Sequence, residues 1–152
     1  MTLLLHIVLS FLTSFAFSFI YNSPKRTFVY SGLAGCCGYM ASYLVETYFG
    51  IDSIYSKFIG SLALGCVSQI LARKFKVPVI SFLVTGLIPL VPGSIISRAT
   101  QKLIQLNFGT ATPIFIEGML IASSIALGLL ISNQIAKMLG FNQVTKEDYY
   151  PN

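Results

Sequence analysis

The sequence contains few charged residues. Of its 152 residues, 10% are charged and 55% are hydrophobic, and the mean hydropathy is +0.77. A soluble globular protein has about 25% charged residues, so water is not the main solvent for a chain of this composition. We expect an all-α integral membrane protein, a polytopic helix bundle, because backbone groups facing lipid must be hydrogen-bonded within helices.

Motifs of soluble enzymes and of metal sites are also lacking. There is no Walker-type phosphate loop, no G-x-S-x-G motif and no histidine cluster, since His6 is the single histidine. Cys36, Cys37 and Cys66 lie inside apolar runs, where a thiol behaves as a small hydrophobic group. The net charge of +5 is spread over the joints between apolar runs rather than along one basic stripe. We expect no enzymatic activity, no cofactor, no metal and no nucleic-acid partner.

Charged residues divide the chain into apolar segments long enough to cross a bilayer. A helix needs about 20 mostly apolar residues for this. The sequence therefore predicts about five transmembrane helices in a single domain of residues 1–139, followed by a short polar tail at 140–152. The predicted spans lie near residues 3–21, 28–49, 54–72, 79–97 and 113–136.

Basic residues predict the orientation of these helices. They are concentrated in the first and third loops, so the positive-inside rule places residues 22–27 and 73–78 in the cytoplasm and the N-terminus outside. The first segment could instead be a cleaved signal peptide. However, no Lys or Arg precedes it, and it exceeds a usual apolar core of about 7–15 residues. Charge does not decide whether the fourth segment crosses the membrane or re-enters from one side.

The fourth segment contains two prolines and two glycines within eight residues, from Gly86 to Gly93. Pro89 and Pro92 have no N–H group, and their rings clash with carbonyl groups one turn earlier. This pattern predicts a broken helix. Broken backbone is tolerated in a membrane only inside protein or beside a watery cavity, and it often indicates a transporter binding site. The alternative is a kink that serves helix packing alone.

Residues around this break are the candidate substrate-binding residues. Pro92 suits the first position of a new helix, and the free N–H groups that follow it could hold a carboxylate with help from the helix dipole. Hydroxyl and guanidinium groups follow within about one turn. The set is Thr85, Gly86, Pro89, Pro92, Gly93, Ser94 and Arg98. Residues 94–107 also have the pattern of an amphipathic helix, which could lie in the membrane interface.

Glu117 is the one acidic residue embedded in an apolar run. A charged side chain at the bilayer centre costs about 2.5–3.5 kcal/mol on insertion scales, so we expect Glu117 to face the bundle interior or to be protonated. It is the candidate for proton coupling, or for binding a substrate amine. Alternatively, it lies close enough to the helix start to reach the interface.

Small and amide side chains predict contacts between helices. Ser31 with Gly35, and Ser61 with Gly65, are small residues four positions apart, which allow helix backbones to approach closely in lipid. Three amides within apolar runs are expected to form hydrogen bonds between helices: Gln69, Asn133 and Gln134.

Three segments resemble the threonine/serine exporter family. Residues 21–26 (YNSPKR) resemble its Asn–Pro–Arg junction after the first span, residues 87–93 (LIPLVPG) its central proline–glycine signature, and residues 122–128 its last helix. Over residues 8–136 the order of spans is similar to the small subunit of the split, two-chain exporters. A tyrosine often follows the proline–glycine pair in that family, whereas Ile95, Ile96 and Ser97 stand here, which leaves the substrate open.

The resemblance implies a secondary transporter subunit in the bacterial inner membrane. It would export small carboxylate-bearing metabolites, either threonine- and serine-like amino acids or a dicarboxylate, together with a larger membrane subunit of the same family. Two alternatives stand beside this hypothesis. One is a self-sufficient, homodimeric proton-coupled transporter, and the other is a membrane assembly subunit that transports nothing.

Overall fold

The computed structural model describes residues 2–21 and 24–140, and all regular structure in this part is helical. Four of its helices are long and apolar enough to cross a membrane, and a bent pair of shorter helices is a fifth candidate when the two are taken as one span. The prediction of an all-α membrane bundle with a broken fourth helix is therefore confirmed. The elements are α1 (Thr2–Ile20), η1 (Lys25–Thr27), α2 (Phe28–Phe49), α3 (Ser53–Phe75), α4 (Ile80–Leu87), η2 (Ile88–Leu90), α5 (Gly93–Ile104) and α6 (Phe108–Met138).

Local sequence explains where these helices end. Gly50 follows α2 with φ 59°, a left-handed conformation that glycine adopts without steric cost. Helix α3 ends with Arg73 and Lys74, whose charges complement the negative end of the helix dipole.

Helix α6 begins five residues before the predicted position and contains Pro113. The predicted tail at 140–152 lies outside the described residues apart from its first residue, as does part of the predicted loop at 22–27.

Helix α6 runs parallel to α3. Ser124 of α6 donates a hydrogen bond to the Ile54 carbonyl oxygen near the start of α3, and Asn133 accepts one from Gln69 further along α3. The residue numbers of these contacts increase together along α3 and α6, which occurs only when two helices are parallel. The segment from α4 to α5 must therefore carry the chain from the C-terminal end of α3 back to its N-terminal end. This segment crosses the bundle and is not re-entrant.

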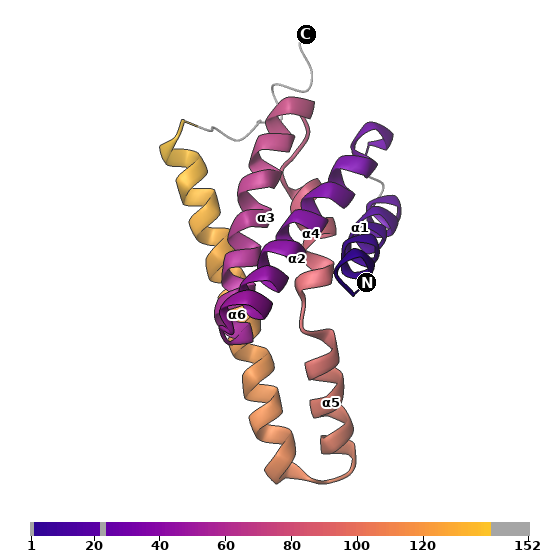
Figure 1. Ribbon diagram of the computed structural model, residues 1–152, viewed down its shortest axis with the longest axis vertical. Helices are drawn as coiled ribbons and strands as arrows, with labels where there is room; N and C mark the ends of the chain where they lie inside the picture. Colours follow the sequence, from indigo (N-terminus) through magenta and orange to yellow (C-terminus); the bar gives the residue numbers. More distant parts are fainter. Residues whose placement is uncertain (1, 22–23, 141–152) are drawn as a thin grey trace.

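The bundle has two distinct ends. At one end the C-termini of α3 and α6 meet, and Arg73 donates a hydrogen bond to the Gly140 carbonyl oxygen. We call this the basic end, since six basic residues of the described part lie there: Lys25, Arg26, Arg73, Lys74, Lys76 and Lys137. We call the opposite end the hairpin end. There, α5 and the first half of α6 form a helical hairpin that projects beyond the other helices (Figure 1).

The other helices pack through small residues. A methyl group added to Gly35 would overlap the Ser14 side chain of α1 and approach the Gly86 backbone of α4. One added to Gly65 would overlap the Ser132 side chain of α6. The predicted small-residue positions thus allow close helix contacts, and many large apolar side chains point outward, as expected for a protein in lipid.

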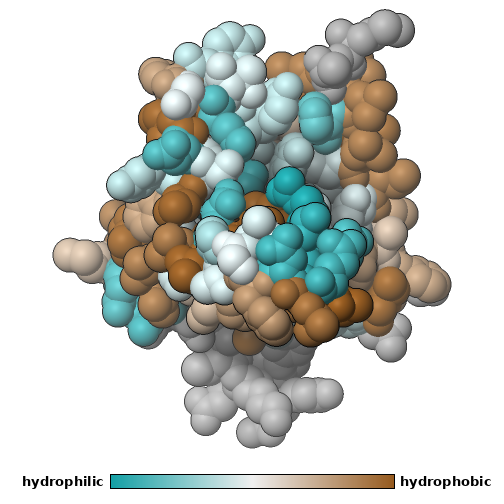
Figure 2. Space-filling view, turned by 90° about the horizontal axis from the view of Figure 1, so that it is seen from below, coloured by the Kyte–Doolittle hydropathy of each residue, from teal (hydrophilic) through white to brown (hydrophobic). Residues whose placement is uncertain are grey.

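Helix α5 is amphipathic, as predicted, but its apolar side packs against α6 instead of lying alone in an interface. Ala99 is its fully buried residue, and Ile96 lies against Gly118 of α6. Arg98 and Lys102 are exposed. Viewed from the hairpin end, hydrophilic residues gather near the middle of the face, and hydrophobic atoms occupy much of its rim (Figure 2). The hairpin therefore presents a polar patch beside large apolar surfaces.

Candidate substrate site

The fourth segment is broken, not merely kinked. Its two parts, Ile80–Leu90 and Gly93–Ile104, are bent by 55°. The N–H group of Val91 still donates to the carbonyl oxygens of Leu87 and Ile88, at 3.2 and 3.3 Å. Pro92 then prevents continuation of the first helix and caps the second. The break predicted from the prolines is thus present in the structure.

The predicted site residues before the break are buried between helices. The hydroxyl group of Thr85 donates to carbonyl oxygens of its own helix, at 2.9 and 3.2 Å. Gly86 lies against the Gly35 backbone of α2. Pro89 and Pro92 are partly buried. These residues fix the position of the break by packing and offer few free polar groups.

The predicted site residues after the break are exposed. Gly93, Ser94 and Arg98 all lie on the surface of the single chain. The sequence analysis expected the N–H group of Gly93 to be free, but it donates to the Val91 carbonyl oxygen at 2.8 Å. The N–H groups of Ser94 and Ile95 belong to the first turn of α5, which lacks a preceding turn to supply acceptors. The donors left without an acceptor from a preceding turn are therefore the N–H groups of Ser94 and Ile95, and the exposed guanidinium group of Arg98 lies one turn further along α5.

Glu117 does not face the bundle interior, so this part of the sequence expectation is wrong. Its side chain is exposed because the next residue, Gly118, occupies the side of α6 that contacts α5. Glu117 instead lines an open hollow of about 550 Å³ along α6, together with Phe108, Pro113 and Ile116. All residues lining this hollow belong to α6, so its other side is open to a lipid, water or a partner.

A second hollow, also of about 550 Å³, lies between α3, α4 and α6 toward the basic end. Its polar lining is the amide pair Gln69 and Asn133, in which Nε2 donates to Oδ1 at 3.2 Å. The predicted interhelical hydrogen bonding of these two residues is confirmed, whereas Gln134 is exposed. None of the predicted binding residues near the break lines either of these two hollows.

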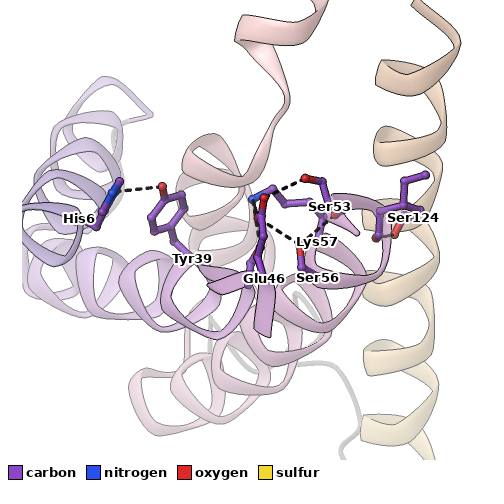
Figure 3. Close-up of polar contacts among 9 residues, drawn as sticks. His6, Tyr39, Glu46, Ser53, Ser56, Lys57 and Ser124 are labelled. Atoms are coloured by element: carbon purple, nitrogen blue, oxygen red, sulfur yellow. Dashed lines mark hydrogen bonds and ion pairs between the residues drawn. The ribbon is translucent and has the colours of Figure 1, made fainter. Parts of the chain in front are cut away.

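A polar network that the sequence analysis missed joins α1, α2 and α3 (Figure 3). It connects the hairpin-end halves of three helices. Within the described residues it also contains the one ion pair, between Lys57 and Glu46. We call it the α1–α3 polar network, and its members are His6, Tyr39, Ser42, Glu46, Ser53, Ser56 and Lys57.

Lys57 is the centre of this network. Its Nζ donates to Ser42 Oγ at 3.0 Å, lies 3.7 Å from Glu46 Oε2, and is 5.6 Å from the centre of the Tyr39 ring. That last distance allows a cation–π interaction. The hydroxyl group of Tyr39 is 3.3 Å from Nδ1 of His6 on α1. The ammonium group of Lys57 on α3 is therefore held against α2, and Tyr39 extends the network to His6 of α1.

Glu46 is held by hydroxyl groups from the start of α3. Ser53 Oγ donates to its Oε1 at 2.9 Å. Ser56 Oγ lies 3.4 Å from its Oε2, while the shorter hydrogen bond of Ser56, at 3.0 Å, is donated to the Ser53 carbonyl oxygen. Among the described residues, no three His, Cys, Asp or Glu side chains lie close enough to hold a metal ion. The groups of the network itself offer charge pairing and hydrogen bonding.

In a comparison with protein families, residues 6–135 match a family described as threonine/serine exporter, ThrE. The matched region runs from within α1 to near the end of α6 and includes the break and the α1–α3 polar network. No curated protein and no solved structure gives a significant match to the chain.

Proposed function

Because the chain belongs to the threonine/serine exporter family, we propose that it is a subunit of a secondary transporter that exports small metabolites. Threonine- and serine-like amino acids are the first substrates to test, and dicarboxylates the second. Both carry a carboxylate, which helix starts and arginine side chains bind well. The chain is a multi-pass membrane protein, and we place it in the bacterial inner membrane.

The observation that carries this proposal is the break in a segment that crosses the whole bundle. Discontinuous helices near the middle of a membrane supply transporters with polar backbone groups for substrates and ions. In our proposal, Thr85, Gly86, Pro89 and Pro92 hold the break in position. The groups that follow it, at Gly93, Ser94 and Arg98, face the substrate carboxylate.

We propose that the basic end lies in the cytoplasm. The parallel arrangement of α3 and α6 places six basic residues of the described part at that end and three at the other, Lys57, Arg98 and Lys102. The positive-inside rule favours this orientation, with the N-terminus outside. In a chain whose native cysteines have been replaced, Lys25→Cys and Lys74→Cys should resist impermeant thiol reagents added outside intact cells. Ready labelling at these positions would show that the basic end lies outside, which contradicts the proposed orientation.

We also propose a second, larger membrane subunit as partner. The hairpin exposes large apolar side chains such as Ile104, Leu106 and Phe108, which are 76%, 75% and 58% exposed. Exposed Arg98 and Glu117 lie on the same hairpin. Lipid alone suits apolar groups but not charges, whereas a partner subunit could cover the apolar surface and enclose a polar path. Glu117 is then placed to couple proton movement at that contact.

Reconstitution in liposomes tests the proposal. The chain is inserted alone, or with the larger family member from the same genome, and efflux of labelled threonine, serine and succinate is measured. We expect substrate-specific efflux only when both subunits are present. Efflux by the chain alone would instead favour the homodimeric transporter. The absence of efflux from a correctly assembled complex would favour a subunit that transports nothing, and would overturn the export function.

A further inference from the structure

The α1–α3 polar network points to a second place where the substrate binds. We propose that Lys57 and Glu46 form a substrate station at the hairpin end, where Lys57 binds the carboxylate and Glu46 the ammonium group of a zwitterionic amino acid. This inference rests on the proposed export function and adds residues outside the break. It is carried by the direction of Lys57, its unused donors, the position of Glu46 and the nearness of the break.

Lys57 points into the bundle, although it lies near a helix end. A lysine in such a place usually extends its ammonium group toward water, and helical side chains lean toward the N-terminus of their helix. Both effects would direct Lys57 outward. Instead its Nζ bonds to Ser42, which is fully buried and lies one turn deeper in α2 than Glu46. The side chain of Lys57 is only 18% exposed.

The ammonium group of Lys57 has hydrogen-bonding capacity to spare. A lysine side chain has three donors, and within the described residues one of them bonds to Ser42. Glu46 Oε2 lies 3.7 Å away, well beyond the roughly 2.7–2.9 Å of a charge-assisted hydrogen bond. The ion pair is therefore loose. A substrate carboxylate could approach Lys57 without displacing a short hydrogen bond to Glu46.

Glu46 is accessible from the hairpin end. Its side chain is 42% exposed, and the two hydroxyl groups of Ser53 and Ser56 hold it in place. A carboxylate fixed in this way is a suitable acceptor for a substrate ammonium group. The hydroxyl group of Ser53, which is only partly buried, can both donate and accept, which suits the hydroxyl group of threonine or serine. The station therefore matches all three polar groups of such an amino acid.

The station lies beside the break. A methyl group added to Gly60 of α3 would lie 2.7 Å from Cβ of Ser42 and 3.1 Å from Cδ2 of Leu90. Ser42, which accepts the hydrogen bond from Lys57, therefore lies at the same depth in the bundle as Leu90, the last residue of η2. Movement of η2 during transport would change the surroundings of Ser42 and Lys57. A substrate released from the break would meet Lys57 on its way to the hairpin end.

Substrate selectivity tests the station in the complete transporter, reconstituted with its second subunit. For Glu46→Gln, we expect the apparent KM for threonine to rise at least tenfold and the KM for succinate, which has no ammonium group, to stay the same or fall. For Lys57→Gln, the KM should rise at least tenfold for both substrates. The control Asp52→Asn removes an exposed acidic residue from the same end and should change neither. Equal effects of Glu46→Gln on the two substrates would overturn the proposal.

A purely structural role for the pair predicts a different result. Removing one partner leaves a charge without its counterion, which itself destabilises a protein. We therefore include the double variant Glu46→Gln with Lys57→Gln, in which no charge is left unpaired. A structural role would leave the threonine KM of the folded double variant unchanged and would lower only its abundance or maximal rate. Our proposal predicts that the double variant has normal abundance and a KM for threonine raised at least tenfold. The conservative variant Lys57→Arg should have a KM for threonine between those of the wild type and Lys57→Gln.

A binding measurement separates this inference from the export function. Threonine should raise the unfolding temperature of the purified wild-type assembly, and the double variant should lose this shift. If the wild-type assembly transports neither substrate, the export function fails, and the shift still decides whether the station binds an amino acid. If transport occurs but all variants keep the wild-type KM and the wild-type shift, the station fails while the export function stands.

Discussion

The bundle of α1–α4 and the later part of α6 differs from the projecting hairpin in how its surfaces are filled. Within the bundle, Gly35, Gly60, Gly65 and Gly86 face neighbouring atoms so closely that even a methyl group would overlap them. In the hairpin, Gly118 makes one such close contact, with Ile96 of α5, whereas Gly109 has open space around it. The bundle therefore packs several helices against one another, whereas the hairpin packs two helices and leaves the charged side chains of Arg98 and Glu117 exposed beside apolar ones.

The largest expected effect follows from enlarging a residue inside the bundle. The Cβ atom of Gly86→Val would overlap the Leu64 side chain and lie in tight contact, at 3.3 Å, with the Gly35 backbone. Overpacking of this kind typically costs about 1–3 kcal/mol, so the unfolding temperature in detergent should fall clearly. Gly109→Val on the hairpin is the matched control and should lower it much less, because nothing lies within 4 Å of the added Cβ atom. Equal losses in the two variants would contradict the difference between the regions.

Restoring a continuous helix across the break between α4 and α5 should have the next largest effect. Pro89→Ala with Pro92→Ala restores two backbone donors and removes the helix start that faces the ligand. We expect the apparent affinity for substrate to fall at least about tenfold, equivalent to about 1.4 kcal/mol, at normal membrane abundance. Kinetics of efflux against substrate concentration measure this. Pro78→Ala, before α4, is the control, and an unchanged affinity in the double variant would remove the break from the mechanism.

A change on the hairpin should affect export but not stability. Glu117→Gln removes an exposed charge, and exposed substitutions usually change stability by less than about 0.5 kcal/mol. We expect an unchanged unfolding temperature, with efflux reduced several-fold and no longer responsive to an imposed pH gradient. Efflux at several gradients measures this. Wild-type rates and an intact gradient response would exclude Glu117 from coupling.

The smallest effect concerns a single hydrogen bond in the bundle. A double-mutant cycle of Gln69→Ala and Asn133→Ala should give a coupling energy of about 0.6 kcal/mol, the average for hydrogen bonds between membrane helices. Unfolding equilibria of the four proteins supply the number. The cycle of Gln69 with exposed Gln134 is the control and should show no coupling. Similar coupling in both cycles would mean that the bond contributes nothing specific.

The fold could be predicted because its determinants are local. Charged residues stand at the ends of apolar runs, so helix positions follow from the sequence, and α2 occupies the same residues as the second predicted span. The break follows from the covalent structure of Pro89 and Pro92, whatever surrounds them. Whether the fourth segment crosses the bundle could not be predicted, because the positions of the charged residues do not distinguish the two alternatives.

The positions of side chains depend on contacts that are distant in sequence. Glu117 and Gly118 differ by one residue, yet only the packing of α5 decides which of them is buried. The α1–α3 polar network joins residues up to 33 positions apart in one bond, as in His6 and Tyr39. One signal was available, because Glu46 and Lys57 lie at similar distances from the short connection between α2 and α3. A hairpin at that connection brings them together.

The length of α6 has a consequence for the depth of Glu117. Its 31 residues measure about 46 Å at 1.5 Å per residue, against about 30 Å for the hydrocarbon thickness of a bilayer. Even a tilt of about 40°, near the upper limit for such helices, leaves a span of about 35 Å. The contact between Arg73 and Gly140 fixes the far end of α6 among basic residues, so the excess length emerges at the hairpin end. Glu117 lies only about 14 Å from that end of the helix. Headgroups and water can reach a carboxylate at this depth, although its apolar sequence neighbours suggest a position in lipid.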